Sequence, residues 1–195
     1  MLGRKGFVVS VLVLTLMSVS PIAFAQSAKR TVQGDEVTLT FHGPGSKANP
    51  AEISFKGENY QKPLRVVDVT EADWRRSSPE SSYRGMLSAA KSGDLEWILA
   101  SFAPQDRERV KAVLSDPGAR QRHHDFHKQV VHSEINMRID YGEYAILLVT
   151  ERQKNGRTIT SEVAMKKFSA GWLGTNDLHE DAFFVMVLEA IKTRL

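Results

Sequence analysis

The hydrophobic pattern of the chain changes at Val131, and this change restricts the possible folds more than any other feature of the sequence. Over residues 78–130 apolar side chains recur every three or four positions, which is typical of amphipathic helices. Over residues 131–174 they alternate with polar ones, which is typical of strands with one buried face. The pattern therefore predicts an α+β fold, in which helices cover one face of a curved antiparallel sheet.

Capping residues mark the helix starts in the first region. Serine and aspartate are good N-caps, and proline is favoured in the first helical turn. Four helices are predicted, starting at Ser78, Asp94, Asp106 and Asp116. In the last of them, Phe126 and Val130 are expected to face the core.

Turn signals divide the second region into a meander of strands. Gly142-Glu143 and the strong hairpin signal Asn155-Gly156 separate its first three runs. In the first run, one side is expected to be apolar and buried, and the other polar and wet. The apolar side contains Ile135, Met137, Ile139 and Tyr141, and the polar side contains Glu134, Asn136, Arg138 and Asp140. A final apolar segment, residues 180–194, predicts a mostly buried C-terminal helix.

The first 25 residues have the pattern of a signal peptide. Two basic residues precede an apolar core over residues 7–17, and Ala23-Phe24-Ala25 forms a cleavage site. The core is shorter than the roughly 20 residues that a transmembrane helix needs. We expect cleavage after Ala25, a periplasmic or secreted protein, and no stable membrane anchor once the signal is removed.

The charge of the chain also depends on this leader. The net charge is +3, and it falls to +1 without the two basic residues of the leader. A near-neutral domain does not predict a nucleic-acid partner. The chain has no cysteine, which excludes a thiolate nucleophile and disulfides. No glycine-rich phosphate loop or G-x-S-x-G motif is present, and no cofactor is expected.

Residues 26–77 predict an N-terminal β segment and a linker. A polar arm over 26–33 precedes an alternating strand at 35–42 and a Gly/Pro-rich loop at 43–50. Two further short strands are expected, at Ile53–Phe55 and at Leu64–Val69. Such short strands bury too little surface to fold alone, so we expect them to pack on a domain formed by 78–195.

Several phrases over residues 78–175 resemble one known family. SPESSYRGMLSAAKSGDLEWIL resembles an opening pair of capped helices, and GEYAILLV resembles a central strand of that family. Asn155-Gly156, the strand VAMKK and Gly171-Trp172 are similar to its last hairpins. The family is the nuclear-transport-factor-two-like superfamily, which has the cystatin-like fold of ketosteroid isomerases. The resemblance implies a cone-shaped space between helices and sheet, to which the N-terminal β segment and the C-terminal helix are additions.

One candidate metal site is a pair of histidines. His123 and His127 lie one helical turn apart, a spacing that can place two imidazoles on one metal. A metal site needs a third ligand, for which only Asp125 or His132 is near in sequence. Because neither spacing is diagnostic, the alternative is a solvated helix face, and no metal is predicted.

Catalytic and ligand-binding candidates are few. Isomerases of the resembled family use a carboxylate and a hydrogen-bond donor that face the cone, and Tyr83, Asp140 and His127 are the available acids or bases. No motif matches the catalytic residues of these isomerases, and Asp140 is expected to be solvated. Tyr83, Trp97 and Trp172 are the ligand-binding candidates, although aromatic residues at such positions are more often core. Trp74, which precedes two arginines, is expected to face the solvent.

The sequence therefore leaves two functions open. The first is a non-catalytic module of the cell envelope that binds a small apolar ligand or an envelope protein. The second is a small isomerase or hydrolase that uses the same cavity. Such sheets often dimerise through the face without helices, which makes a homodimer one candidate assembly. The polar side chains expected on that face argue against dimerisation.

Overall fold

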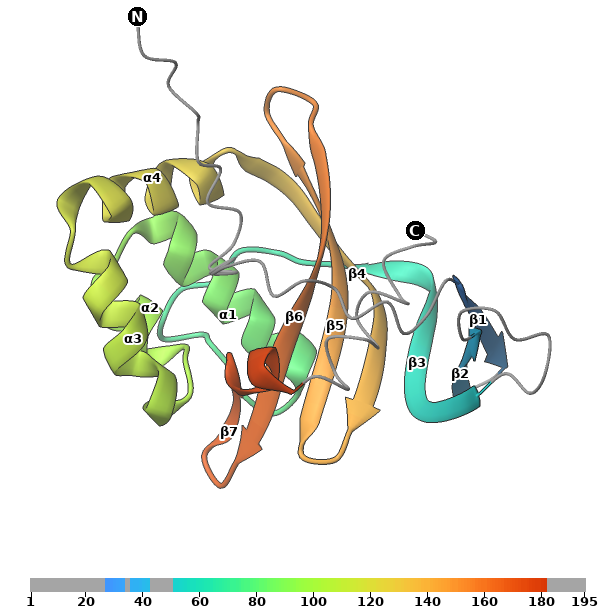
Figure 1. Ribbon diagram of the computed structural model, residues 1–195. Coiled ribbons are helices and arrows are strands. Elements are labelled where there is room, and N and C mark those ends of the chain that lie inside the picture. The colour runs from blue at the N-terminus through green and yellow to red at the C-terminus, as the bar shows by residue number, and fades with distance from the viewer. Residues whose placement is uncertain (1–26, 34–35, 43–50, 182–195) are drawn as a thin grey trace, which may run out of the picture.

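The computed structural model describes residues 27–33, 36–42 and 51–181 (Figure 1). The predicted signal peptide lies outside these residues, as does nearly all of the predicted C-terminal helix. The described part contains four α-helices and seven strands. The α+β class is confirmed.

Most of the helices begin where the capping residues predicted. They are α1 (Pro79–Ser92), α2 (Leu95–Ala100), α3 (Pro104–Leu114) and α4 (Pro117–Lys128). Ser78 caps α1 in a capping box with Ser81, and Asp94 and Asp116 cap α2 and α4. The predicted start of α3 at Asp106 is wrong. Asp106 instead accepts hydrogen bonds from Thr175 Oγ1 (2.9 Å) and from the Asn176 backbone (3.1 Å).

The strands pair in chain order and are all antiparallel. Five of them form the main sheet: β3 (Ala51–Arg65), β4 (Val130–Tyr141), β5 (Tyr144–Gln153), β6 (Thr158–Phe168) and β7 (Gly171–Gly174). The hairpin of β1 (Ser27–Gln33) and β2 (Glu36–His42) extends the sheet beyond β3. A 3₁₀ turn, η1 (Asp177–Glu180), follows β7.

The N-terminal segment differs from the prediction in two places. Residues 27–33, expected to be a polar arm, form β1 and pair with β2. The two short strands expected around Phe55 and Leu64 belong to one long strand, β3, whose register shifts between Asn59 and Leu64. Pairing with β4 on both sides of this irregularity keeps the strand continuous.

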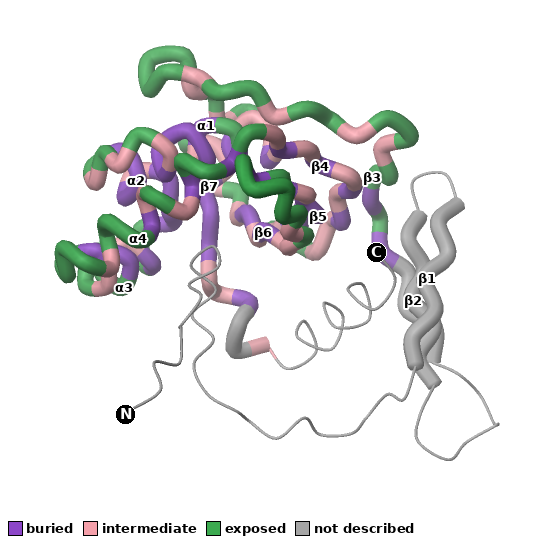
Figure 2. Tube along the Cα trace, turned by 90° about the horizontal axis from the view of Figure 1, so that it is seen from above, coloured by how far each residue is buried: buried purple, intermediate pink, exposed green. Residues whose placement is uncertain are grey.

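The four helices gather on one side of the main sheet, which we call the helix face (Figure 1). Tyr83 and Leu87 of α1 pack there on Leu147, Val149 and other buried strand residues. A second cluster lies among the helices themselves and includes Trp97, Val110 and Leu114. Figure 2 shows the buried residues concentrated where α1 lies against the strands.

A β-bulge at Asn136 changes which side chains of β4 face the helices. Ile135 pairs with Val149 and the next pair joins Met137 to Leu148, so Asn136 has no partner in the register. Ile135 therefore points to the helix face. Met137, Ile139 and Tyr141 point to the opposite face of the sheet. The prediction that all the apolar residues of this strand share one side is wrong, because the extra residue exchanges the two faces.

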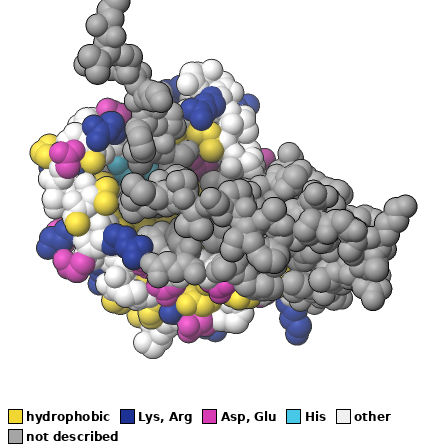
Figure 3. Space-filling model, in the orientation of Figure 1, with side chains coloured by type: hydrophobic (Ala, Val, Ile, Leu, Met, Phe, Trp, Pro, Cys, Tyr) yellow, Lys and Arg dark blue, Asp and Glu magenta, His cyan; other side chains and the backbone are white. Residues whose placement is uncertain are grey.

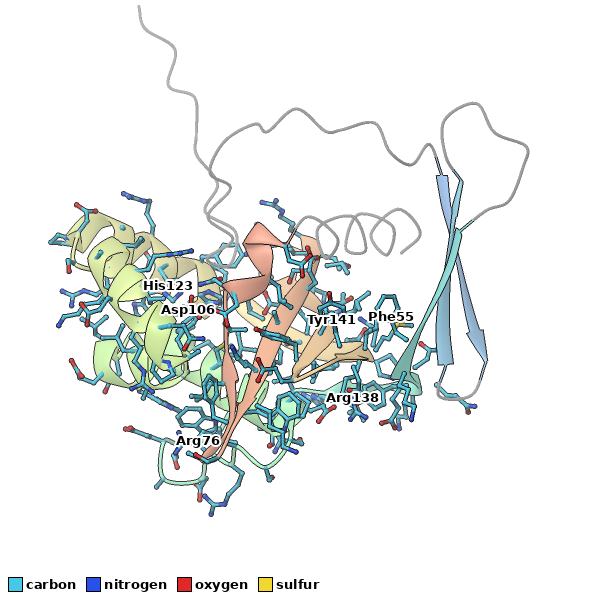
Figure 4. All side chains as sticks on the ribbon, turned by 60° about the horizontal axis from the view of Figure 1, so that its bottom comes forward. Phe55, Arg76, Asp106, His123, Arg138 and Tyr141 are labelled. Carbon is cyan, nitrogen blue, oxygen red and sulfur yellow. The ribbon has the colours of Figure 1, made fainter. Side chains whose placement is uncertain are left out.

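Arg138 demonstrates the exchange. It was expected on the wet side, but its Nη1 lies 3.1 Å from Glu80 Oε1 of α1. Figure 4 shows Arg138 on one side of the strands and Phe55 and Tyr141 on the other. The face opposite the helices is therefore apolar over β4 and β5.

The described surface is mixed in charge. Figure 3 shows basic and acidic side chains interspersed around the described part of this view. None of the helices in the described ranges is long and apolar enough to cross a membrane.

Candidate functional site

Polar side chains from three adjacent strands meet on the helix face, at the end of the sheet where β4 begins. Ser133 of β4 lies opposite Glu151 of β5. Ser161 of β6 lies opposite Val149. Val149 precedes Glu151 by two residues on β5, so Ser161 and Glu151 share the helix face. Gln153 continues the row and is buried. We call Ser133, Glu151, Gln153 and Ser161 the polar patch.

Tyr83 of α1 lies over this patch and binds it directly. Its hydroxyl donates to Glu151 Oε1 at 2.8 Å and lies 3.5 Å from Ser133 Oγ. The Glu151 side chain is fully buried, with 1% of the residue exposed, and its Oε2 has no hydrogen-bond partner within the described part of the chain. Buried polar atoms are normally paired, so this oxygen marks a position where a further polar group can bind.

Burial controls the protonation of this pair. It raises the pKa of Glu151, although the hydrogen bond from Tyr83 and the charge of Lys91 offset part of the rise. Burial also raises the pKa of Tyr83 well above its ordinary value, and the neighbouring Glu151 charge adds to this. The site thus combines a carboxyl that retains its proton to a higher pH than usual with a phenol that stays neutral.

His123 and His127 of α4 are also buried, and their ring centroids lie 4.6 Å apart. The prediction of a solvated helix face is wrong. Helix α4 packs across α1 with its histidine side inward, while the predicted core residue Phe126 is only half-buried. The Nδ1 atoms of both histidines have no partner among the described residues.

The histidines are held neutral by their surroundings. Burial, then the electrostatic effects of His123 and Lys91, lower the pKa of His127 to about 3. Burial and His124 lower the pKa of His123. The charge of Lys91 lowers the pKa of both His127 and Glu151.

Neither predicted third ligand lies with the histidine pair among the described residues. Asp125 accepts a hydrogen bond from Gln121 (2.9 Å), and His132 lies 3.1 Å from Glu134. Within the described ranges, no group of three or more potential ligands is arranged to hold a metal ion. We therefore interpret the two imidazoles as neutral hydrogen-bonding groups.

Asp140 lies away from Tyr83, although both were catalytic candidates. It is at the opposite end of β4 from Ser133 and forms an ion pair with Arg138 at 3.0 Å. Its side chain is half-exposed, as the sequence predicted. The same end of the sheet holds Glu80, which accepts a hydrogen bond from Tyr60 at 2.8 Å. This charged group ties α1 to β3 and β4.

The tryptophans also separate. Trp97 is buried among the helices, whereas Trp172 is half-buried at the edge of the cluster that contains Tyr83. Trp74, expected to face the solvent, packs beside Gly85 and donates its Nε1–H to the Ser82 carbonyl at 3.3 Å. Of the three predicted ligand-binding residues, only Tyr83 contacts the polar patch.

Glu151 was missed in the sequence, although a signal for it exists. In the strand YAILLVTERQ it falls on the same side of the alternation as Leu147 and Val149. A charged residue in the buried phase of a central strand is rare unless it is paired. That exception identifies Glu151 as the chemically unusual residue of β5.

The neutral state of His127 predicts a pH-dependent stability. In the unfolded chain the pKa of His is about 6.5, so lowering the pH from 7 to 5 protonates the unfolded state but not the folded one. The stability linked to His127 is complete above pH 6.5 and is lost as the pH falls towards 3. The His127→Phe variant has no group that titrates at this position. When the pH falls from 7 to 5, its free energy of unfolding should therefore decrease by about 2 kcal/mol less than that of the wild type.

Urea denaturation at the two pH values measures this difference. Glu151 acts in the opposite direction, because its raised pKa lets the folded state take up a proton first. Since Glu151 is present in both proteins, its contribution cancels in the comparison. Equal pH slopes in the two proteins would contradict a buried, neutral His127.

No protein-family model, no curated protein and no solved structure matches the chain.

Proposed function

We propose that this protein is an exported, non-catalytic module that binds a small, mainly apolar ligand between α1, α4 and the helix face. Export rests on the signal pattern of residues 1–25, and the arrangement of helices on the sheet suits a nuclear-transport-factor-two-like domain. The observation that carries the binding proposal is Glu151 Oε2, which is buried without a partner in the described part of the chain.

Of the five buried side-chain polar atoms without a partner in the described ranges, four belong to the polar patch or to α4, and the fifth is Trp97 Nε1. Besides Glu151 Oε2, the atoms without a partner in the described ranges include Ser161 Oγ and the Nδ1 atoms of His123 and His127. Each such buried group costs about 1–3 kcal/mol unless a ligand or water satisfies it. A polar group of a ligand can therefore gain binding energy at this site.

The surroundings favour an apolar ligand body. Leu87, Leu147, Val149 and Val163 are buried beside Tyr83 on the helix face. Apolar surroundings with a small number of convergent polar groups are typical of sites for small molecules. The polar patch would orient the ligand, and the apolar residues would supply most of the contact area.

Glu151 tests the proposal. Native mass spectrometry of the protein purified without denaturation should detect a bound small molecule on the wild type. Glu151→Gln and Tyr83→Phe should each lower its occupancy at least tenfold, since a hydrogen bond to a charged group contributes about 1.5–3 kcal/mol. The matched control Glu108→Gln changes an exposed glutamate of α3 and should keep the ligand.

The readout separates binding from folding, because circular dichroism on the same samples shows whether each variant is folded. A wild-type protein that carries no small molecule would contradict the proposal. So would a folded Glu151→Gln variant that retains the ligand at wild-type occupancy.

An acid–base enzyme is the second candidate, and one observation favours it. Burial raises the pKa of the Glu151 carboxyl next to the Tyr83 hydroxyl, and a carboxyl with a raised pKa is a common general acid or base. In this case Glu151 takes the role for which Asp140 was a candidate. Conversion of the co-purified molecule by the wild type, but not by Glu151→Gln, would support the enzyme over the binding module.

A further inference from the structure

The sheet face opposite the helices is apolar and buried. We call it the outer face and define it by Met137, Ile139, Ile146 and Leu148 of β4 and β5. Each of these residues is at most 2% exposed. None of them belongs to the two clusters described beneath and among the helices. The groups that bury the outer face are therefore different from α1–α4.

Aromatic residues extend the outer face at the end where β4 turns into β5. The rings of Phe55 and Tyr141 lie 6.1 Å apart on the same side of the sheet (Figure 4). Tyr144 follows on β5, two residues before Ile146. The result is a continuous apolar surface along two central strands.

The chain itself leads to this surface. After β7, Asp177 of η1 accepts hydrogen bonds from Tyr144 (3.3 Å) and Lys166 (2.8 Å). Leu178 is buried, and Asp181 accepts a hydrogen bond from Tyr141 at 3.4 Å. Residue 181 is thus held at the Tyr141 end of the outer face.

The segment that follows fits the face in composition and length. Residues 182–195 (AFFVMVLEAIKTRL) are mainly apolar, including Phe183, Phe184, Val187 and Ile191. As a helix these fourteen residues would be about 21 Å long. The outer face from Tyr144 to Thr150 spans about 20 Å of strand.

We propose that residues 182–195 bind along the outer face of the same chain as a helix, starting from the anchor at Asp181. This segment occupies the surface through which a second copy would otherwise dimerise. Burial of such an apolar face is favourable, and a contiguous exposed patch of this kind would promote association. The inference does not depend on the ligand-binding proposal, because the two sites lie on opposite faces of the sheet.

Engineered cysteines test the position of the segment. Because the chain has no cysteine, an introduced pair reacts without competition. Ala164 is half-buried on the outer face, opposite Ile146. The first double variant combines Ala164→Cys with Val187→Cys in the segment. A second pair, Thr150→Cys with Ile191→Cys, tests the far end of the face.

A short bismaleimide should link both pairs within one chain in dilute solution. The control pair, Glu108→Cys with Val187→Cys, places one thiol on α3 and should give at least tenfold less internal product. Peptide mapping by mass spectrometry identifies the linked residues, and circular dichroism checks that each variant is folded. Cross-links that join two chains would show that a second copy occupies the face, and internal linkage no greater than in the control would also overturn the proposal.

Discussion

Replacement of Trp97 by alanine should lower the free energy of unfolding by about 3–5 kcal/mol, as for other buried large aromatic residues. Trp97 is 7% exposed and packs in the cluster that joins α1, α2 and α3, where its neighbours include Phe102, Val110 and Leu114. The cavity would remove the largest side chain of the cluster that packs α2 and α3 against α1. Urea denaturation of the folded variant measures the loss.

Trp172→Ala is the matched comparison. In the sequence, Trp172 and Trp97 are alike, because both are ligand-binding candidates at positions that are more often core. The structure places Trp172 half-buried, with its backbone held by Arg76 and Ser82. The substitution keeps these backbone hydrogen bonds and should cost about half as much as Trp97→Ala. Equal losses would show that Trp172 is as central to the core as Trp97.

Local signals predicted the helices and hairpins well, because the interactions that form them are local. Ser78, Asp94 and Asp116 each accept a hydrogen bond from a backbone N–H three residues ahead, which a sequence pattern can capture. The turn at Asn155-Gly156 is equally local, with φ of +82° at the glycine. Asp106 failed as a cap because its carboxylate binds a segment about 70 residues away.

The faces of the elements were harder to predict than their existence. One unpaired residue, Asn136, reverses the two sides of β4 after Ile135, and alternation alone cannot show a bulge. Similarly, the spacing on α4 allowed either Phe126 or the histidines to face inward. Packing of α4 against α1 decided in favour of His123 and His127.

The candidate site could be predicted only in part, because one of its residues follows from a local pattern and the other from strand pairing. Tyr83 lies on the inward stripe of a well-defined helix, so its position followed from helical periodicity. Its partner Glu151 is 68 residues away, and only strand pairing brings it beneath α1. Asp140 appeared equally suitable in the sequence, but it lies at the other end of the sheet.

Gly171→Ala should also destabilise the protein strongly, by at least about 3 kcal/mol, because backbone strain and a steric clash combine. Gly171 has φ of +113°, which L-residues rarely adopt. A Cβ there would lie 2.6 Å from the Arg76 Cβ and 3.0 Å from its carbonyl carbon. Next to it, the Trp172 backbone donates to the Arg76 carbonyl at 2.9 Å and joins β7 to the linker before α1.

Gly142→Ala separates the two causes. Gly142 also has a positive φ, +59°, but a Cβ there would meet nothing within 4 Å. It should therefore cost only the left-handed strain of about 1–2 kcal/mol. Urea denaturation of the two variants compares a strained turn in open space with a strained turn against another backbone. If Gly171→Ala costs no more than Gly142→Ala, the linker can move away from β7, and the contact with Arg76 does not fix the entry to α1.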